Sequence, residues 1–135
     1  KFNFRYFKQY VINKNRTIKD ILMDQKFISG LGNIYVNETL FFSGIKPTKK
    51  VKNLSEGEIR KIIKFTKRIL SKAIALGGSS IKNFSSNNGK KGLFQQYFCV
   101  YGKKGEKCSK KSCGSNIIKI VISNRATFYC DKCQK

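Results

Sequence analysis

The sequence of 135 residues contains no histidine and no tryptophan, has a single proline, and carries only seven acidic side chains. Without histidine, a metal site in this chain has to rely on cysteine thiolates or on the few carboxylates. No stretch approaches the roughly 20 apolar residues of a membrane span, and no apolar signal-peptide core follows Lys1. We therefore expect neither a membrane-spanning nor a secreted protein. The first residue is not methionine, so we also expect further sequence upstream.

The scarcity of acids leaves a large excess of positive charge. Lysine and arginine number 29 against 7 aspartates and glutamates, which gives a formal net charge of +22. Such a charge destabilises the compact state by self-repulsion, so a polyanionic partner such as nucleic acid is the natural explanation. The alternative is a solvated lysine surface, as in a ribosome-like protein or a protein from an AT-rich genome.

The five cysteines are spaced for metal binding. Cys108 and Cys113 enclose four residues, Cys130 and Cys133 enclose two, and sixteen residues separate the two pairs. This is close to the spacing of a zinc ribbon, in which four thiolates surround one tetrahedral Zn²⁺ ion. We therefore predict one structural zinc ion held by these four side chains. The fifth cysteine, Cys99, lies in an alternating run and is expected to be a small buried residue.

Apolar periodicity predicts that the chain begins with helices. Residues 4–11 place aromatic and aliphatic side chains on one face, which indicates a short helix. Thr17, followed three positions later by Asp20, indicates the start of a second helix that ends near Gln25. Aspartate is a weaker partner than glutamate in such a capping box.

Residues 28–42, ISGLGNIYVNETLFF, are apolar enough for a buried helix, yet the helix is entered through two glycines and an asparagine. Asn33 is a good N-cap and Gly44 is a natural C-cap, so we predict a helix between them. Glycine is favoured where the backbone needs unusual dihedral angles or where another group must approach closely. Either reason could explain Gly30 and Gly32.

Capping signals and a change of periodicity divide the rest of the chain. Ser55 and Glu58 form a capping box before a long amphipathic helix that should end at Gly77-Gly78. Residues 79–92 are polar and glycine-bearing, as in a flexible loop. Beyond this loop, alternating hydrophobicity predicts short strands at 94–101, 117–122 and 126–129. The expected fold is mainly α-helical, followed by a small β zinc ribbon.

Four stretches carry a resemblance to a known family: LMDQKFISGLGNIYVNETLFFSGIKP, ALGGSSIKNF, GLFQQYFCVYGKKGEKC and RATFYCDKCQK. In this order they closely resemble bacterial formamidopyrimidine-DNA glycosylase of the Fpg/Nei family, over essentially the whole chain. The resemblance implies the C-terminal portion only: a helix–two-turn–helix domain over residues 1–92 and a zinc finger over 93–135, with the N-terminal catalytic domain absent. It also implies that residues 79–92 are the segment that covers the everted base, with Ser80 and Phe94 as candidate base contacts.

The resemblance implies three places at which DNA is held. In the family the glycine turn brings backbone N–H groups to a DNA phosphate and the asparagine that follows adds its side chain, which assigns Gly32 and Asn33 to this grip and makes Asn33 both cap and phosphate ligand. Lys19 matches a lysine near the lesion-bearing nucleotide. Arg125 matches an arginine that contacts phosphates beside the lesion and is implicated in the second elimination step, δ-elimination. From the residues alone, Asn33 could be only a cap, Lys19 one of many lysines, and Arg125 a solvated turn residue.

The resemblance further implies the reaction of the parent enzyme. The amine of an N-terminal proline forms a Schiff base with the sugar, oxidised purines (8-oxoguanine and formamidopyrimidines) are excised, and β,δ-elimination cleaves the strand. That proline is not present here, since Pro47 is internal. We therefore expect this chain to bind damaged double-stranded DNA without cleaving it. We also expect a monomer in the bacterial cytoplasm, associated with the nucleoid.

Two other classes of function stay open at this point. One is a stand-alone zinc-ribbon module, such as a ribosomal or transcription accessory protein; the other is a pyrimidine-specific family member resembling endonuclease VIII. The sequence also departs from the commonest family spacing, because four residues, Ser109 to Ser112, separate the first two cysteines where two are usual. We expect this longer knuckle still to close on zinc.

Overall fold

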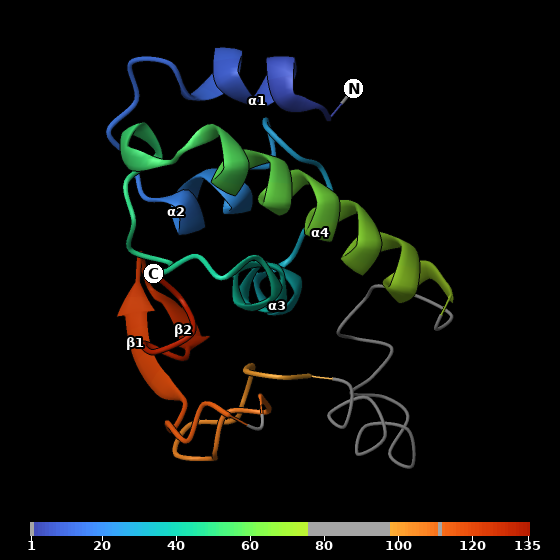
Figure 1. Ribbon diagram of the computed structural model, residues 1–135. Coiled ribbons are helices and arrows are strands. Elements are labelled where there is room, and N and C mark those ends of the chain that lie inside the picture. The colour runs from blue at the N-terminus through green and yellow to red at the C-terminus, as the bar shows by residue number, and fades with distance from the viewer. Residues whose placement is uncertain (1, 76–97, 111) are drawn as a thin grey trace.

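The protein is mostly helical, with one β-hairpin at its C-terminal end (Figure 1). The structure is a computed structural model that describes residues 2–75, 98–110 and 112–135. Its elements, in chain order, are α1 (Phe4–Val11), α2 (Ile18–Met23), α3 (Asn33–Ser43), the 3-10 helix η1 (Val51–Asn53), α4 (Glu56–Ala75), β1 (Ile118–Ile122) and β2 (Arg125–Tyr129). This arrangement confirms the predicted fold class. No helix in these ranges is both long enough and apolar enough to cross a membrane.

Some of the sequence predictions fall on residues that the structure does not describe. These are the end of the long helix at Gly77-Gly78, the loop 79–92 with Ser80, and Phe94.

Side-chain caps begin α2 and α4 at the positions that the sequence predicted. The Thr17 hydroxyl accepts a hydrogen bond from the Asp20 N–H at 3.2 Å. Before α4, the Ser55 hydroxyl accepts from the Glu58 N–H at 3.1 Å, and the Glu58 carboxylate accepts from the Ser55 N–H at 2.9 Å. The capping box of α4 is therefore complete, whereas that of α2 is made only from the Thr17 side.

α3 is the central element, and Figure 1 shows it nearly end-on between α4 and the hairpin. Its apolar side chains Val36 and Leu40 belong to the core of the helices, while Phe41 packs into the core of the C-terminal module. The polar side chains Asn37 and Glu38 are buried as well. A helix buried on all sides must satisfy its polar groups through neighbouring elements, which makes α3 a link between the two parts of the protein.

The two ends of α3 differ in how well the sequence predicted them. Gly44 is the C-cap, as predicted, with the left-handed φ of 73° that favours glycine. The prediction that Asn33 is the N-cap was wrong: Gly32 is the N-cap, and Asn33 is the first residue of the helix. The Asn33 side chain bonds other partners: its amide donates to the Ala126 carbonyl at 3.0 Å, and its oxygen accepts from the Asn37 side-chain amide at 3.4 Å rather than from a backbone N–H.

The apolar faces of α1 to α4 meet in one core, which we call the helical core. On α4 the predicted positions Ile59, Ile62 and Ile69 are buried, and Ile63 and Leu70 are partly buried against them. The remaining members come from α1, α2, α3, η1 and the segments that connect the helices: Phe7, Val11, Ile18, Ile21, Leu22, Phe27, Ile28, Leu31, Tyr35, Val36, Leu40, Ile45, Val51 and Leu54.

The hairpin confirms two of the three predicted strands. β1 and β2 pair antiparallel, with Ile122 opposite Arg125 at the tip. Ser123 and Asn124 between them have left-handed φ values of 50° and 64°, as in the tight two-residue turns that suit the twist of a hairpin. Arg125 was predicted in the turn itself; it is instead the first residue of β2.

The predicted strand at 94–101 is not a strand where it is described. Residues 98–101 form a turn. The N–H groups of Cys99, Val100 and Tyr101 donate to the carboxylate of Glu38, at 2.7, 2.9 and 2.9 Å. One acidic side chain therefore takes the hydrogen bonds that a neighbouring strand would otherwise have accepted.

Candidate metal centre and nucleic-acid interface

The four cysteines predicted as metal ligands converge on one point. The sulfur atoms of Cys108, Cys113, Cys130 and Cys133 all lie within 4.8 Å of one another. The Sγ atoms of Cys108 and Cys133 are 3.7 Å apart, and those of Cys113 and Cys130 are 3.4 Å apart. A tetrahedral zinc site with Zn–S bonds of about 2.3 Å places its sulfurs about 3.8 Å apart, so the thiols fit one zinc ion.

The longer first knuckle closes in spite of its extra residues. The Cys113 N–H donates to the Lys110 carbonyl at 3.0 Å, and the Cys108 N–H donates to the Ser115 carbonyl at 2.8 Å. Gly114, directly after the second cysteine, has a left-handed φ of 73°. Cys99 lies outside the four-thiol cluster, as expected; it is partly buried against the core of the module rather than fully buried.

The surroundings of the thiols shift their pKa values in different directions. Burial raises the pKa of Cys108, and burial raises that of Cys133 to about 12. A backbone hydrogen bond at Ser115 lowers the pKa of Cys113 to about 6. Thiolate is the ligand form, so a divalent ion supplies the positive charge that keeps all four sulfurs deprotonated.

The second zinc knuckle is joined to the end of α3. Gln134 is fully buried, accepts from the Cys130 N–H at 2.9 Å and donates to the Ile45 carbonyl at 2.9 Å. The Lys135 N–H donates to the Gly44 carbonyl at 2.9 Å. The metal centre and the C-cap of α3 are therefore parts of one packed unit.

Three polar side chains of α3 hold the module along the helix. Asn33 bonds the Ala126 carbonyl, and Asn37, one turn later, accepts from the Phe128 N–H at 2.7 Å. Asn37 also donates to the Asn33 carbonyl at 2.8 Å, which ties the first two together. Glu38 completes the series; burial raises its pKa, although its backbone N–H donors act in the opposite direction.

Lys19 is the predicted site residue whose surroundings are least evident from the sequence. It is 1 % exposed, and its Nζ donates to the Thr127 hydroxyl of β2 at 2.8 Å. Burial, and then the positive charge of Arg125, lower the pKa of Lys19 to about 8. Arg125 itself is exposed. The structure thus brings these two cations, 106 positions apart in the chain, into electrostatic contact.

The geometry of the turn before α3 explains both of its glycines. Gly30 has a left-handed φ of 87°, so its glycine is required by the backbone. Gly32 has an ordinary φ of −86°, and a Cβ built on it would meet nothing within 4 Å. The space above Gly32 is open, as close approach by another molecule would require. Gln25 supports the turn, because its side-chain oxygen accepts from the Gly30 N–H at 3.0 Å.

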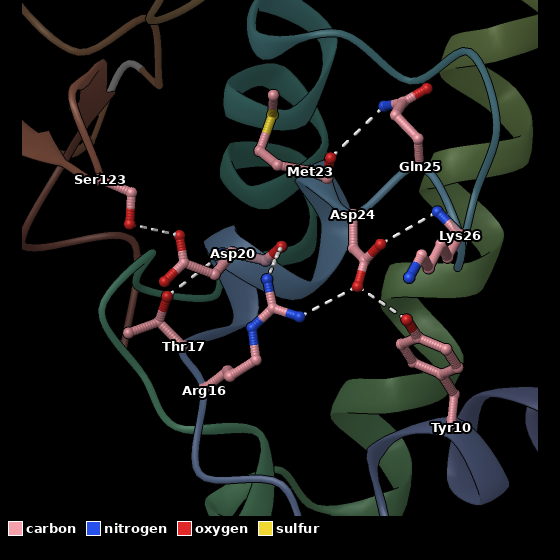
Figure 2. Close-up of polar contacts among 9 residues, drawn as sticks. All are labelled: Tyr10, Arg16, Thr17, Asp20, Met23, Asp24, Gln25, Lys26 and Ser123. Carbon is pink, nitrogen blue, oxygen red and sulfur yellow. Dashed lines mark hydrogen bonds and ion pairs between the residues drawn. The ribbon is translucent and has the colours of Figure 1, made fainter.

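Lys19 and Asn33 reach the start of β2, next to Arg125, through their hydrogen bonds to Thr127 and Ala126. Of the predicted site residues, Arg125 also lines a polar groove of about 490 Å³. The groove is lined by Arg16, Asp20, Met23, Asp24, Gln25, Lys26, Ser123 and Arg125, most of which Figure 2 shows. Asp24 accepts from the Tyr10 hydroxyl at 2.7 Å and from the Arg16 guanidinium at 2.9 Å. The first of these bonds contributes most to lowering the pKa of Asp24, to about 2.

Sequence reasoning missed the residues that assemble this site. Glu38 and Asn37 had no assigned role, and the bond between Asp20 and Ser123 was not foreseen. A signal did exist for the first pair, since two polar side chains in an otherwise apolar helix need buried partners. Nothing in the local sequence indicated which partners they would find.

Comparisons with known proteins agree with this architecture. Residues 1–85 match the family model of the formamidopyrimidine-DNA glycosylase H2TH domain, and residues 105–135 match the zinc finger found in FPG and IleRS. The chain is 43% identical over 134 residues to the formamidopyrimidine-DNA glycosylase of Rickettsia bellii, covering 99% of this chain and 48% of that protein. It is 43% identical over 133 residues to the Bacillus subtilis protein of the same name, covering 98% of this chain and 48% of the relative.

Solved structures give the same result. The Lactococcus lactis formamidopyrimidine-DNA glycosylase bound non-covalently to DNA containing an abasic site superimposes with a TM-score of 0.84 and 40% identity, over 99% of this chain and 47% of that one. The Lactococcus lactis protein in complex with DNA containing FAPY-dG gives the same TM-score and identity, over 99% and 48%. The chain thus spans about half the length of the relatives it matches. It belongs to the formamidopyrimidine-DNA glycosylase family, of which it carries the helix–two-turn–helix domain and the zinc finger with its four-thiol zinc site.

Proposed function

We propose that this chain is the DNA-binding C-terminal part of a bifunctional DNA glycosylase and AP lyase that removes oxidised purines from double-stranded DNA. The observation that carries the proposal is that Lys19, Asn33 and Arg125, from three elements, meet at the start of β2 in a chain with a net charge of +22. The titles of the structural relatives, which name abasic and FAPY-dG DNA, support the same partner.

The turn before α3 is suited to grip a phosphate with backbone groups. Gly32 offers no side-chain cap, and no side chain among the described residues makes a capping bond to the start of α3. The first N–H groups of the helix are therefore available to an anion, and the helix dipole favours negative charge there. The Asn33 side-chain amide donates to the Ala126 carbonyl. We therefore assign the part of Asn33 in the phosphate grip to its backbone N–H.

The two cations have different tasks in this proposal. Arg125 is exposed at the start of β2, and its planar fork of donors suits phosphate oxygens beside the lesion. Its proposed role in δ-elimination follows from the same position. Lys19 lies deeper, with a pKa of about 8, so we propose that it meets the lesion-bearing nucleotide as an ammonium at neutral pH and loses its charge as the pH rises above 8.

The covalent chemistry is assigned to groups that these 135 residues do not include. In the proposed whole enzyme a proline amine at the N-terminus attacks the sugar, and the base-covering segment corresponds to residues 79–92, which lie outside the described ranges. The one proline here, Pro47, follows α3 inside the chain. We propose that the chain acts as a monomer in the bacterial cytoplasm, at the nucleoid, and that by itself it binds damaged DNA without cutting it.

A salt series tests the three proposed contacts. Affinity for duplex DNA with an abasic-site analogue is measured for the Arg125→Ala, Lys19→Ala and Asn33→Ala variants, with Lys61→Ala on the exposed side of α4 as the matched control. Each lost phosphate contact of a cation should flatten the salt dependence by about one ion. Asn33→Ala keeps the backbone N–H but loses the bond that holds the turn to Ala126, so it should weaken binding with little change in slope. Three variants that all bind like the control would contradict the proposed interface.

Borohydride trapping tests the proposal that the nucleophilic amine is not among these 135 residues. With DNA that contains 8-oxoguanine or an abasic site, the 135-residue chain should give no covalent adduct, while a family member with an N-terminal proline should be trapped. An adduct formed by the chain itself would mean that one of its own amines acts as the nucleophile. Zinc-dependent binding to RNA in preference to damaged duplex DNA would favour a stand-alone zinc-ribbon module instead.

A further inference from the structure

The tip of the hairpin is tied to α2 by a hydrogen bond that the proposed function does not use. The Ser123 hydroxyl donates to the Asp20 carboxylate at 2.9 Å, across 103 positions of sequence (Figure 2). Ser123 is the first residue of the two-residue turn, and Arg125 follows that turn directly. The bond therefore holds the chain two residues before the arginine.

Asp20 is free to make this bond because it does not complete its own helix cap. In a full capping box the acidic side chain turns back to the N–H of the capping residue, as Glu58 does at Ser55. In α2, Thr17 caps the Asp20 N–H, and the Asp20 carboxylate points to the hairpin instead (Figure 2). The weaker capping partner seen in the sequence is thus used for a tertiary contact.

The charge of Asp20 works against the binding of DNA at this place. It is one of only seven acidic residues, and it lines the same groove as Arg16, Lys26 and Arg125. A carboxylate beside phosphate-binding cations repels the phosphate and partly neutralises the cations. Any favourable effect of Asp20 on binding must therefore come from geometry.

Two neighbouring residues of α2 hold β2 on either side of the arginine. Asp20 bonds Ser123, two positions before Arg125, and Lys19 bonds Thr127, two positions after it. The Thr127 hydroxyl also donates to the Arg125 carbonyl at 3.2 Å. Because both anchors come from one turn of a helix, they fix the first residues of β2 relative to α2 as a rigid segment.

We propose that Asp20 and Ser123 are positioning residues: their hydrogen bond fixes the place of Arg125 relative to Lys19, so that both cations meet the same stretch of DNA backbone. This inference rests on the proposed function, because it gives Asp20 and Ser123 the task of aligning Arg125 for phosphate. The two residues touch no nucleotide in this scheme and act only through the arginine.

Matched substitutions distinguish the effect of losing the Asp20–Ser123 hydrogen bond from the effect of losing the charge of Asp20. Ser123→Ala removes the donor alone, Asp20→Ala removes acceptor and charge together, and Asp20→Asn keeps an acceptor oxygen while it removes the charge. Glu106→Gln, on the exposed surface of the zinc module, is the control for a lost acidic charge elsewhere.

The first measurement is the affinity of the zinc-loaded 135-residue chain for duplex DNA with a tetrahydrofuran abasic analogue. Ser123→Ala should weaken binding about threefold, as expected for one lost hydrogen bond. Asp20→Asn should bind more tightly than the wild-type chain, by more than Glu106→Gln does. In an Arg125→Ala background, Ser123→Ala should have no further effect. Equal losses in both backgrounds would overturn the proposal, because the serine would then act without the arginine.

The second measurement needs no DNA and keeps the two proposals apart. Amide hydrogen exchange of residues 123–126 in the free chain should accelerate in Ser123→Ala and Asp20→Ala and stay slow in Asp20→Asn. Unchanged exchange in all three variants would overturn the positioning role. A loosened hairpin tip in the variants, together with a wild-type chain that does not bind DNA, would instead refute the proposed function and leave the anchor itself established.

Discussion

The helical part and the zinc module of this protein are held together by different physics. Residues 2–75 share an apolar core to which α1, α2, α3 and α4 all contribute. The module from residue 98 onward has a small core in which Val100, Ile117 and Phe128 pack with the metal-binding cysteines. One of its buried aromatic rings, Phe41, is supplied by α3. Burial can account for the first region, whereas the second depends on zinc and on the helix beside it.

The contact between the two regions is a third case, because it is mostly polar and buried. Glu38, Asn37, Asn33 and Lys19 each bond the backbone or a hydroxyl of the module. Such bonds add only modest net stability, but each fixes a direction. The comparison shows that apolar burial makes this protein compact, while buried polar groups set the orientation of the hairpin on the helices.

Removing zinc should have the largest effect, because it should unfold the zinc module and leave the helical part folded. Chelation under reducing conditions should unfold the module, because structural zinc supplies about 10–16 kcal/mol of apparent binding energy in small fingers. The helices should keep most of their far-ultraviolet circular dichroism. Cys130→Ser should behave like the chelated protein, and Cys99→Ser, which lies outside the cluster, should retain a full equivalent of zinc. A chelated chain that keeps the amide protection of β1 and β2 would contradict this prediction.

Disrupting the polar contact between the two regions should have the next largest effect on stability. Glu38→Ala leaves three buried N–H donors without their acceptor, and each unsatisfied group costs about 1–3 kcal/mol, so the free energy of unfolding should fall by about 3 kcal/mol or more. Chemical denaturation followed by circular dichroism measures it. Glu106→Ala, an exposed acid on the module, is the matched control. Equal stabilities of the two variants would show that the turn 98–101 does not depend on the carboxylate.

Raising the pH should test the cation that joins the two regions. The pKa of Lys19 is lowered to about 8, and a phosphate partner would raise it again in the complex. Affinity for damaged DNA should therefore fall as the pH rises from 7 through about 9, because the free protein loses a proton that the complex retains. An α-amino group ordinarily titrates at about pH 8 as well, so the Lys19→Met variant supplies the baseline. The slope should disappear in Lys19→Met, and a wild-type affinity that does not change with pH would refute the prediction.

A local change in the helical part should have a smaller effect. Ser55→Ala removes the N-cap of α4, which costs about 1 kcal/mol, and leaves the helical core untouched. The thermal unfolding temperature should drop by a few degrees without any loss of zinc. Metal release from this variant at unchanged temperature would mean that α4 and the zinc site are more tightly coupled than their contacts indicate.

Acid should produce the weakest and most gradual effect on the helical part. The bond from Tyr10, with those from the Lys26 N–H and Arg16, lowers the pKa of Asp24 from 3.8 to about 2. Its stabilising contribution is present above the unfolded value and is lost as the pH falls from about 4 towards 2. Thermal unfolding of wild-type and Asp24→Asn chains across that range should converge at low pH. By then the thiolates are protonated and the zinc is released, so a module that unfolds after the helices would contradict the comparison.

The parts that sequence reasoning predicted correctly are those with local causes. The cap at Thr17, the capping box at Ser55 and Glu58, and the left-handed glycine at Gly44 each involve residues within a few positions of one another. The hairpin strands followed from alternating hydrophobicity. The failures are the N-cap Asn33 and the strand expected at 94–101, of which residues 98–101 are described. Both occur where a side chain bonds a distant backbone.

The sequence by itself therefore determined the helices, the hairpin and the zinc-binding spacing, because these depend on neighbours along the chain. Only the tertiary structure decided which of many lysines is buried, where the carboxylates of Glu38 and Asp20 point, and how Arg125 is aligned. The deciding bonds join residues 61 to 108 positions apart. The physical reason is that a buried polar group takes whichever partner the packed elements bring within about 3 Å, and no local pattern encodes that partner.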